Sequence, residues 1–270
     1  MDKVTIPSLQ QKKRNARKIT ALTAYDAPFA KLIDCAGIDI VLVGDTVGMV
    51  LQGEPHTLSV TMDQMLYHTR IVSRVTGHAL VVGDMPFLSY QVSLEETVFN
   101  AGRFLKEAGA EAVKLEGGAR VADRIAHLTR YDIPVMAHIG LTPQSVHRMG
   151  GYKVQGRENP ERILEDAQQV EAAGAFAIVL EGMPAALAAR ITASVHIPTL
   201  GIGAGPHCDG QILVLHDLLG LSPSFHPRFV RQYADLSAMA SKAFQQFKAD
   251  VESGNFPNDS EGYGEDPGPR

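Results

Sequence analysis

Short apolar runs alternate with amphipathic segments along most of the chain. Each run is rich in Val, Ile, Leu or Ala, and Gly, Pro or Asp stands near its ends. Runs of this kind are typical of parallel strands that are buried on both faces. The predicted strands are Ile19–Thr23, Ile40–Val43, Ala79–Val82, Ala112–Leu115, Val135–His138, Ala177–Leu180, Thr199–Ile202 and Gln211–Leu215.

The segments between these runs have the periodicity of crossover helices. Three of them end in Ala-Gly, at 36–37, 108–109 and 173–174, which is a helix stop signal. The predicted helices are Pro28–Ala36, Met62–Val75, Ser93–Ala108, Ala119–Thr129, Pro160–Ala173 and Pro184–Ser194. Eight such alternations favour an α/β fold, a single (β/α)8 barrel (TIM barrel), over an open doubly wound sheet, which usually has about five or six strands.

The two ends of the chain depart from this alternation. The basic cluster of residues 12–18 precedes the first run, and we expect it to be a solvated segment. Residues 228–252 are expected to form an amphipathic helix that closes the barrel base or packs on a neighbouring subunit. From residue 254 onward Gly, Pro, Asn, Asp and Glu dominate, which predicts a disordered acidic tail. The expected organisation is a catalytic barrel domain, 1–253, and a disordered tail, 254–270.

Composition and charge narrow the class of protein. The formal net charge is −5, so counterion-release binding to nucleic acid, which needs a basic face, is not expected. No apolar stretch approaches the roughly 18 residues of a membrane span, and no signal or transit peptide is recognisable. The two cysteines, Cys35 and Cys208, fit a reducing compartment and structural roles. We therefore expect a soluble, cytoplasmic protein that binds neither nucleic acid nor membranes.

Polar groups gather where the predicted strands end. They are Asp45 and Thr46 after the second strand, Asp84 after the third, Lys114 and Glu116 on the fourth, His138 on the fifth and Glu181 after the sixth. One carboxylate after a strand is usually a helix N-cap or a solvated turn. Ionisable groups at five consecutive strand ends instead predict an active site, because barrel enzymes carry their reactive residues at this face.

A divalent cation is the simplest explanation for the acidic groups. Each aspartate follows a glycine, at 44–45 and 83–84, and we expect the glycine to leave the backbone uncrowded while the aspartate enters the barrel mouth. Two close carboxylates repel unless a cation lies between them or one keeps its proton. Mg2+, which prefers oxygen ligands, is the expected ion.

The remaining strand-end residues suggest acid–base chemistry. Lys114 and Glu116 lie two residues apart and so share a face of the strand, where the lysine pairs with Glu116 or with a substrate carboxylate. Glu181 directly follows an apolar strand, which makes it the candidate general base. Residues 201–205, Gly-Ile-Gly-Ala-Gly, bind phosphate or simply form a tight pocket wall. The glycine-containing loop 149–157 is a lid or an ordinary surface loop.

Eight stretches, in order and at matching spacing, resemble one family. They are Thr20–Asp26, Leu42–Met49, Gly83–Phe87, Val113–Gly118, Ala137–Gln144, Tyr152–Arg157, Val179–Glu181 and Gly201–Gly205. The chain closely resembles the 3-methyl-2-oxobutanoate (ketopantoate) hydroxymethyltransferases from about residue 4 to residue 253. The resemblance implies a barrel of the phosphoenolpyruvate mutase/isocitrate lyase group, dependence on Mg2+, 5,10-methylenetetrahydrofolate as co-substrate, and a homodecamer of pentameric rings. It also implies the first step of pantothenate biosynthesis, which gives 2-dehydropantoate and tetrahydrofolate.

The resemblance also implies residue roles. Asp45 and Asp84 match the direct metal ligands, and Glu116 matches a further carboxylate of the metal site. Together with Asp45 and Asp84, the substrate-binding positions are Thr46, Lys114 and His138. Glu181 matches the proposed catalytic base. Thr46 replaces the usual Ser, and Gly-Met-Pro follows Glu181 where the family often has Cys-Val-Pro, so the packing there departs from the pattern.

Three other readings compete with this one. The nearest is a Mg2+-dependent C–C lyase of the same barrel group that acts on another 2-oxo acid without folate. A second makes Lys114 a Schiff-base nucleophile. A third is a catalytically silent barrel that serves as a scaffold or a small-molecule binder.

Overall fold

Every predicted apolar run forms a strand, and the strands close into a barrel. The computed structural model describes residues 1–222 and 227–263. Within these ranges the strands pair in parallel and in chain order, and β1 pairs with β8 to complete the ring. The strands are β1 (Ile19–Thr23), β2 (Ile40–Val43), β3 (Leu80–Asp84), β4 (Ala112–Glu116), β5 (Val135–Gly140), β6 (Ala177–Glu181), β7 (Thr199–Ile202) and β8 (Gly210–Leu213). The predicted (β/α)8 barrel is confirmed.

Four strands run one or two residues further than the apolar pattern predicts. The ladder continues through Asp84, which is paired with Lys114, and through Glu116, which is paired with His138. It also includes Glu181, paired with Gly140. Backbone hydrogen bonding does not depend on side-chain polarity, so a strand can end in a charged residue that the apolar pattern assigns to a loop. Asp84, Glu116 and Glu181 are therefore held by the sheet itself, whereas Asp45 and Thr46 follow the end of β2.

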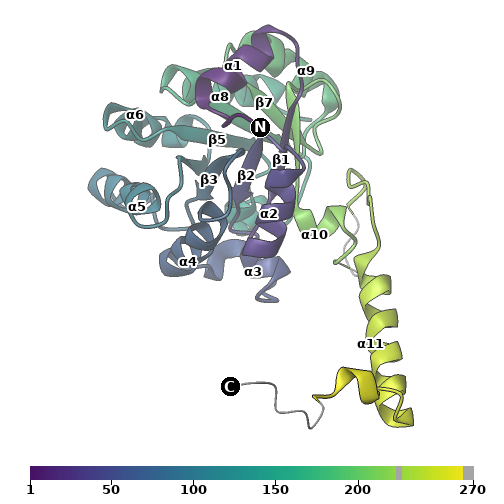
Figure 1. The fold of residues 1–270 in the computed structure, drawn as a ribbon. Helices are drawn as coiled ribbons and strands as arrows, with labels where there is room; N and C mark the ends of the chain where they lie inside the picture. The colour runs from purple at the N-terminus through teal and green to yellow at the C-terminus, as the bar shows by residue number, and fades with distance from the viewer. Residues whose placement is uncertain (223–226, 264–270) are drawn as a thin grey trace. The chain divides into compact units, whose positions relative to one another are not determined.

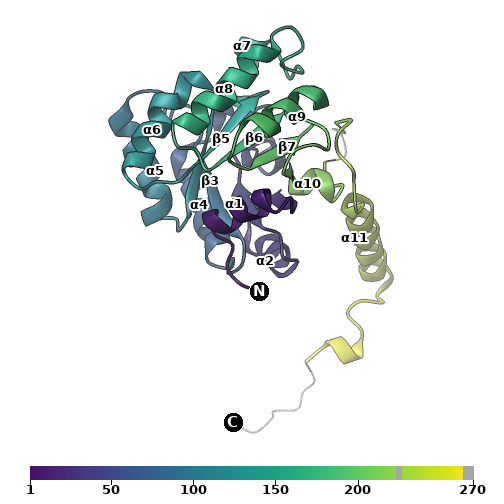
Figure 2. The same cartoon turned by 90° about the horizontal axis from the view of Figure 1, so that it is seen from above.

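Helices surround the strands on the outside of the barrel (Figures 1 and 2). The longer ones are α2 (Ala27–Cys35), α4 (Met62–Ser73), α5 (Leu94–Lys106), α6 (Ala122–Arg130), α8 (Pro160–Ala172) and α9 (Ala185–Ser194). Short helical segments in the loops are α3 (Val47–Val50), η1 (Thr57–Ser59), η2 (Ala119–Val121), η3 (Pro143–Ser145), α7 (Val146–Met149) and α10 (Leu215–Leu218). Side chains of Asp26, Thr61 and Ser93 accept backbone N–H groups at the starts of α2, α4 and α5 and so fix where these helices begin.

The N-terminal segment contains a helix, α1 (Ile6–Arg14), and the expectation that the basic cluster is solvated fits the exposed Arg14, Arg17 and Lys18 but not Lys12 and Lys13. Leu9 is fully buried and packs with Val4 against residues near the N-terminal ends of the strands. The helix thus covers the base of the barrel. Its lysines are held as well: Lys12 pairs with Asp39, and Lys13 Nζ lies 2.9 Å from Asp209 Oδ2.

A second compact unit follows the barrel, and its described residues are 216–222, 227 and 231–263. Its main element is α11 (Leu236–Ser253), which begins at Leu236 rather than at the predicted residue 228 because the Asp235 side chain caps it there. Gly254 ends the helix in the left-handed conformation, φ 71°. Residues 254–263 are exposed and contain one short turn, η4 (Asp259–Glu261). Residues 264–270 of the expected tail lie outside the described ranges, and its disorder stays a prediction.

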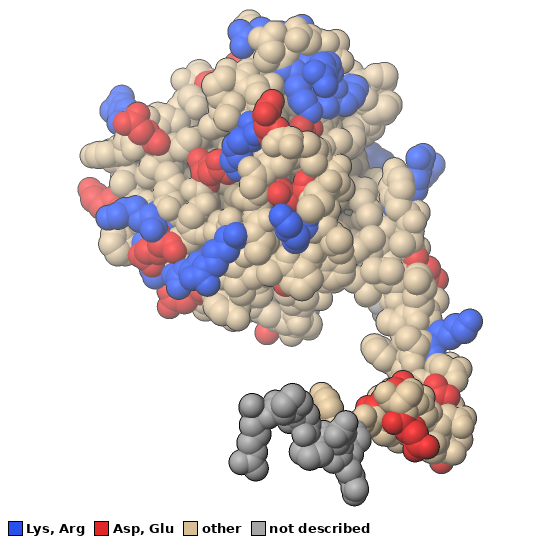
Figure 3. Space-filling model, viewed as in Figure 1, with Lys and Arg blue, Asp and Glu red and all other residues tan. Residues whose placement is uncertain are grey.

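The surface and the helices add two observations. Acidic and basic side chains are intermixed over the face of the barrel unit seen in Figure 3. Among the described residues, no helix combines the length and the apolarity that a membrane crossing requires.

Candidate active site

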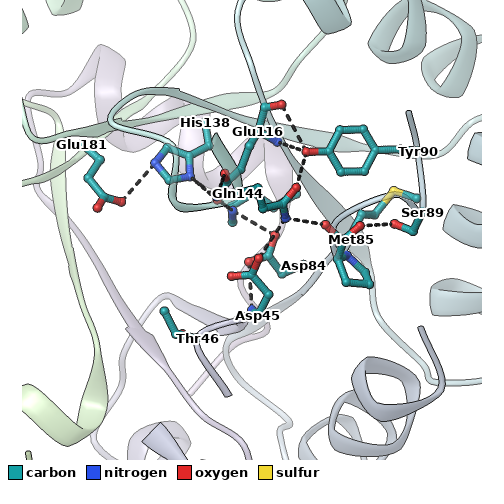
Figure 4. Close-up of polar contacts among 12 residues, drawn as sticks. Asp45, Thr46, Asp84, Met85, Ser89, Tyr90, Glu116, His138, Gln144 and Glu181 are labelled. Carbon is teal, nitrogen blue, oxygen red and sulfur yellow. Dashed lines mark hydrogen bonds and ion pairs between the residues drawn. The ribbon is translucent and has the colours of Figure 1, made fainter. Parts of the chain in front are cut away.

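The strand ends bring the predicted site residues into one cavity at the mouth of the barrel. Asp45, Thr46, Asp84, Lys114, Glu116, His138 and Glu181 all line it. Most of these side chains are buried, whereas the Glu181 side chain is 18% exposed. Figure 4 shows these residues apart from Lys114, which is not labelled, with Glu181 at the left beside His138 and the two aspartates below Glu116. The cavity therefore has a buried charged floor and a partly open acidic rim.

The two aspartates form the most acidic part of this floor. Asp45 donates its backbone N–H to Asp84 Oδ2 at 3.1 Å, and both side chains are at most 2% exposed. Burial raises the pKa of Asp45 well above its ordinary value, and the neighbouring charges of Asp84 and Glu116 raise it further. Burial also raises the pKa of Asp84, although Lys114 opposes this effect. A positive charge placed here would relieve the repulsion.

Lys114 supplies one positive charge to the floor. Its Nζ lies 2.9 Å from Asp84 Oδ1 and 3.6 Å from Glu116 Oε1, so its closest protein partner is Asp84, which was not among the expected partners, Glu116 or a substrate carboxylate. Burial alone would lower the pKa of Lys114, but the surrounding carboxylates outweigh burial and raise the pKa above its ordinary value. A raised pKa favours the ammonium form of Lys114, which is not the form that attacks a carbonyl to make a Schiff base.

His138 connects the floor to the rim. Its Nδ1 lies 3.4 Å from Glu116 Oε1, and its Nε2 lies 3.1 Å from Glu181 Oε2. Burial and the nearby Lys114 lower the pKa of His138, but the two glutamates prevail and raise the pKa to about 9. The imidazole thus holds Glu181 in place through a charge-assisted contact.

Glu116 differs from the aspartates in having several compensating partners. Its Oε2 accepts the backbone N–H of Gln144 at 2.9 Å, and its Oε1 faces Lys114 and His138. Burial raises the pKa of Glu116, yet Lys114 and His138 outweigh burial and hold the pKa below its ordinary value. Glu116 is therefore a stable anion.

Two buried residues that strand-end reasoning did not single out organise this network. Gln144 Nε2 donates to Asp45 Oδ2 at 2.8 Å and to the Met85 carbonyl at 3.0 Å. Tyr90 donates its hydroxyl to Gln144 Oε1 at 2.7 Å and so fixes the orientation of the amide (Figure 4). Gln144 ends one of the family-like stretches, which was its only signal, whereas nothing in the sequence pattern marks Tyr90.

Thr46 has a different setting from the charged residues. Its hydroxyl lies 2.6 Å from the hydroxyl of Tyr25, another buried residue that the strand ends do not reveal. The pair lies beside Asp45 and leaves the Thr46 hydroxyl held in one place. A fixed hydroxyl at the cavity wall can donate to or accept from a bound substrate.

The glycines of the two Gly-Asp pairs are required for different physical reasons. A Cβ on Gly44 would lie 2.8 Å from Thr46 Oγ1, on the cavity side, so this glycine keeps the site open as expected. A Cβ on Gly83 would lie 2.3 Å from the ring of Phe104 in α5. Gly83 is thus required for packing of a helix against the strand, and the expectation that it leaves room at the mouth is wrong.

The residues at this floor suit a hard divalent cation in part. Among the described residues, no group of three or more His, Cys, Asp or Glu side chains is arranged to hold a metal ion by itself. Mg2+ usually takes only one or two protein carboxylates and completes its octahedron with water and substrate oxygens. Asp45 and Asp84, two buried carboxylates that need compensating charge, fit that requirement.

The predicted lid loop lies close to the rim. The backbone N–H of Gln155 donates to the Gly182 carbonyl at 2.8 Å, one residue beyond Glu181. Tyr152 approaches Met49, with its hydroxyl 3.7 Å from the sulfur. Burial raises the pKa of Tyr152, and the carboxylates of Asp45 and Glu181 raise it further. The loop is therefore placed to cover the cavity mouth, though closure stays a prediction.

The departures around the rim are accommodated by packing. Met183 is buried, and the Gly182 N–H donates to the Ile202 carbonyl at 2.9 Å, so the segment after Glu181 is well packed. In the glycine-rich loop, a Cβ on Gly205 would lie 2.4 Å from the Cβ of Ala185, and Gly205 has φ 79°. This close approach supports a tight wall as the reason for these glycines.

Comparison with known proteins places the chain in a family. A family model described as ketopantoate hydroxymethyltransferase matches residues 3–259. A 3-methyl-2-oxobutanoate hydroxymethyltransferase of Geobacter sulfurreducens is 58% identical over 261 residues, which cover 96% of this chain and 98% of that protein. The enzyme of the same name from Pelobacter propionicus is 56% identical over 262 residues, 97% of each chain.

Solved structures with the same fold are much more distant in sequence. Phosphonopyruvate hydrolase in complex with oxalate and Mg++ superposes with a TM-score of 0.62 at 15% identity, over 96% of this chain and 93% of that one. A 2,3-dimethylmalate lyase of the PEP mutase/isocitrate lyase superfamily gives a TM-score of 0.60 at 15% identity, over 96% and 91%. These likenesses show the barrel fold. The full-length sequence matches show more: the chain belongs to the ketopantoate hydroxymethyltransferase family of enzymes.

Proposed function

We propose that the chain transfers a hydroxymethyl group from 5,10-methylenetetrahydrofolate to 3-methyl-2-oxobutanoate, giving 2-dehydropantoate and tetrahydrofolate as the first step of pantothenate biosynthesis. The observation that carries the proposal is the cavity itself. It combines two buried aspartates, the ammonium of Lys114 and the partly exposed carboxylate of Glu181 in a member of this family. Such a floor suits a small anionic oxo acid, and the rim supplies a base.

Asp45 and Asp84 would hold a divalent cation, Mg2+ in the simplest case, with Glu116 as a further carboxylate of the metal site. A bound cation would supply Lewis-acid polarisation of the substrate's keto oxygen, which makes the neighbouring C3–H more acidic. Support comes from the buried position of both aspartates, their raised pKa values and the backbone hydrogen bond that keeps them side by side.

The protein's own groups bind and orient the oxo acid. The ammonium of Lys114 lies on the cavity floor and would neutralise the substrate carboxylate. Thr46 offers a hydroxyl that Tyr25 already holds, and His138 offers a ring N–H beside Glu181. These contacts would direct C3 of the substrate toward the rim.

Glu181 would act as the general base. Its partial exposure lets it reach a substrate in the cavity, and the contact with His138 fixes its direction. After Glu181 removes the C3 proton, a bond forms between C3 and the methylene carbon of the donor. Both bonds from that carbon to the folate nitrogens, N5 and N10, break, and water supplies the hydroxyl oxygen of the product. The proton accepted by Glu181 and one proton from this water pass to the two nitrogens of the leaving tetrahydrofolate.

Exchange of the C3 proton of 3-methyl-2-oxobutanoate with deuterated water tests this proposal without the folate. We expect the wild-type protein to catalyse exchange only when Mg2+ is present. Glu181→Gln should bind the oxo acid and slow exchange by about 10²- to 10⁴-fold, the range of general acid–base effects. Asp84→Asn should abolish the exchange that Mg2+ supports in the wild-type protein.

Glu165→Gln is the matched control, because Glu165 is an exposed glutamate on α8 and its removal should leave exchange unchanged. Exchange at the wild-type rate in Glu181→Gln would remove its role as base. A wild-type protein without Mg2+-dependent exchange would contradict the proposed function as a whole.

The alternative, a Mg2+-dependent C–C lyase that acts on another 2-oxo acid without folate, uses the same floor. The lyase would use a different electrophile, so its product would form without folate. Product formation that requires the folate donor supports the hydroxymethyltransferase instead. A cytoplasmic location and a homodecamer of pentameric rings complete the proposal. The location is supported by the cysteine usage, and the decamer rests on the resemblance alone.

A further inference from the structure

A second cavity opens beside the barrel mouth. It has a volume of about 250 Å³, and its wall begins at Gly117 and Ile139, one residue beyond Glu116 and His138. The opposite wall consists of the start of α8 and part of loop 149–157, including Gln155 and Gly156. The cavity is thus a neighbour of the proposed catalytic groups and shares its two strands, β4 and β5, with them.

Three arginines from three different elements line this space. Arg120 belongs to η2, Arg148 to α7 and Arg162 to α8, and all three are exposed. Within residues 1–222 and 227–263, no hydrogen bond or ion pair joins any of the three guanidinium groups to another residue. We call this space the arginine cavity.

Some other arginines of the barrel are paired. Arg103 pairs with Glu107 and Asp63, Arg124 with Asp123, and Arg190 with Glu161. Others, such as the exposed Arg74 and Arg130, are unpaired among the described residues, so one free guanidinium group is not unusual here. What distinguishes the arginine cavity is that three of them line one space.

The charges in the arginine cavity are poorly balanced. Partial desolvation of the largely exposed Arg148 lowers its pKa, and the positive charges of Arg120 and Arg162 lower it further. The one acidic side chain among the lining residues is Asp166, whose Oδ1 already accepts the Ala119 N–H at 2.7 Å. Three guanidinium groups face a single carboxylate, so a bound anion would relieve their repulsion.

Size and geometry restrict the anion. Pockets that enclose a whole drug-sized ligand usually measure about 300–1,000 Å³, so this cavity suits one end of a longer molecule. Arginine donates in a planar fork that matches a carboxylate in bidentate fashion. Arg120 also lines a hollow that includes Glu116 and Gln144, which connects the cavity to the catalytic floor. A ligand with carboxylates at one end and its reactive carbon at the other fits this arrangement.

We propose that the arginine cavity binds the glutamyl carboxylates of the folate donor. This inference rests on the proposed function, because it assumes a donor with a glutamate tail. The tail would lie against Arg120, Arg148 and Arg162 while the methylene carbon reaches the rim at Glu181. Added glutamate residues on the tail would bring further carboxylates to the same guanidinium groups.

The test compares the double variant Arg148→Gln, Arg162→Gln with the wild-type protein. We expect KM for 5,10-methylenetetrahydrofolate to rise by about ten- to hundredfold, because both guanidinium groups are exposed and solvent reduces what each contributes to binding a carboxylate. KM for the oxo acid and the rate of C3 proton exchange should stay the same. Wild-type KM should fall when the donor carries several glutamates instead of one, and the double variant should lose that preference.

Arg190→Gln is the matched control, because it also removes an arginine from the barrel surface but lies on α9 in a pair with Glu161. An unchanged donor KM in a double variant that still exchanges the C3 proton would overturn the inference and leave the proposed function intact. Loss of exchange in the wild-type protein would overturn the proposed function instead. Equilibrium dialysis with tetrahydrofolate polyglutamates would then still decide whether the cavity binds them, since weaker retention by the double variant supports it and equal retention refutes it.

Discussion

At the scale of single residues, the site separates carboxylates that are equally buried. Glu116 is surrounded by donors, Lys114, His138 and the Gln144 N–H, and its pKa is lowered in spite of burial. Asp45 has one side-chain donor, from Gln144, and its pKa is raised. Because burial acts on both groups, their neighbours decide the difference: Lys114 and His138 lower the pKa of Glu116, whereas the charges of Asp84 and Glu116 raise the pKa of Asp45. The acid that lacks donors is the one that most needs a cation.

Gln144 should accordingly control metal affinity without touching the metal. Gln144→Met removes the N–H donor to Asp45 and the acceptor for Tyr90, so Asp45 loses its orientation. We expect the affinity for Mg2+, measured by isothermal titration calorimetry, to fall by about 10- to 100-fold, the usual cost of losing a group that orients a metal ligand. Tyr90→Phe keeps the Gln144–Asp45 bond and should cost less. Equal Mg2+ affinity in Gln144→Met and wild type would show that this contact does not position Asp45.

At the scale of elements, the sequence predicts best where a side-chain pattern and the backbone agree. The apolar runs locate all the strands because both faces of a barrel strand are buried. The charged residues Asp45, Asp84, Glu116 and Glu181 stand out as interruptions at the ends of those runs, which is why they were found. Gln144 and Tyr90 come from loops without periodicity, and only the folded chain brings them to Asp45 and Glu116.

Helix α1 illustrates the opposite case. Its sequence is strongly polar and basic, and only one residue, Leu9, is buried. A single anchoring residue produces no apolar stripe, so the pattern indicates a solvated segment. The lysines that suggested solvation instead reach acidic side chains and backbone carbonyls at the base of the barrel, such as Asp209 and the Ile197 carbonyl. Such partners cannot be predicted from local sequence because they lie far along the chain.

One link between elements predicts a pH dependence of stability. Asp34 in α2 accepts the backbone N–H groups of Gly77, His78 and Ala79 at 2.8–2.9 Å, which joins this helix to the segment before β3. Burial raises the pKa of Asp34, but these three donors prevail and lower it. A lowered pKa in the folded state means that this stabilisation is present at neutral pH and is lost as the pH falls below about 4.

Asp34→Asn should therefore destabilise the protein by about 2–3 kcal/mol at pH 7, the scale of a lost set of charged hydrogen bonds. The difference from wild type, measured by urea denaturation, should shrink as the pH is lowered toward the folded-state pKa. Asp2→Asn, at an exposed aspartate, should show no such difference. A penalty that stays constant between pH 7 and pH 3 would mean that the charge on Asp34 is not its source.

At the scale of the whole molecule, the barrel separates stability from chemistry. Apolar side chains such as Ile19, Leu80 and Leu200 pack with Leu9 toward the base, while the buried charges gather at the mouth. The buried charges of the floor are unfavourable, but the same strands run through the base and the mouth. The strands therefore cannot move apart at the mouth without disrupting the packed base. Residues of the floor should then reduce the stability of the metal-free protein, and replacing them should raise it.

Asp45→Asn tests this relation directly. The raised pKa of Asp45 means that its charge destabilises the fold at any pH above the unfolded value of about 3.9, and the cost grows until the folded-state pKa is passed. In the presence of a chelator the variant should melt a few degrees above wild type, since about 1 kcal/mol shifts Tm by roughly 2–4 °C in domains of similar size. The advantage should be larger at pH 8 than at pH 4.

Added Mg2+ should reverse the order of the two proteins. A ligand that binds only the folded state raises Tm with its concentration, so the wild-type Tm should climb with Mg2+ whereas the Tm of Asp45→Asn should stay nearly constant. Differential scanning calorimetry over a series of Mg2+ concentrations measures both effects. If the metal-free variant melts below wild type, Asp45 contributes to the fold through its bond with Gln144 more than it costs through repulsion from Asp84, and the floor is not strained. A metal-free Asp45→Asn variant that melts above wild type and does not respond to Mg2+ would instead show that Asp45 destabilises the metal-free fold and binds the ion.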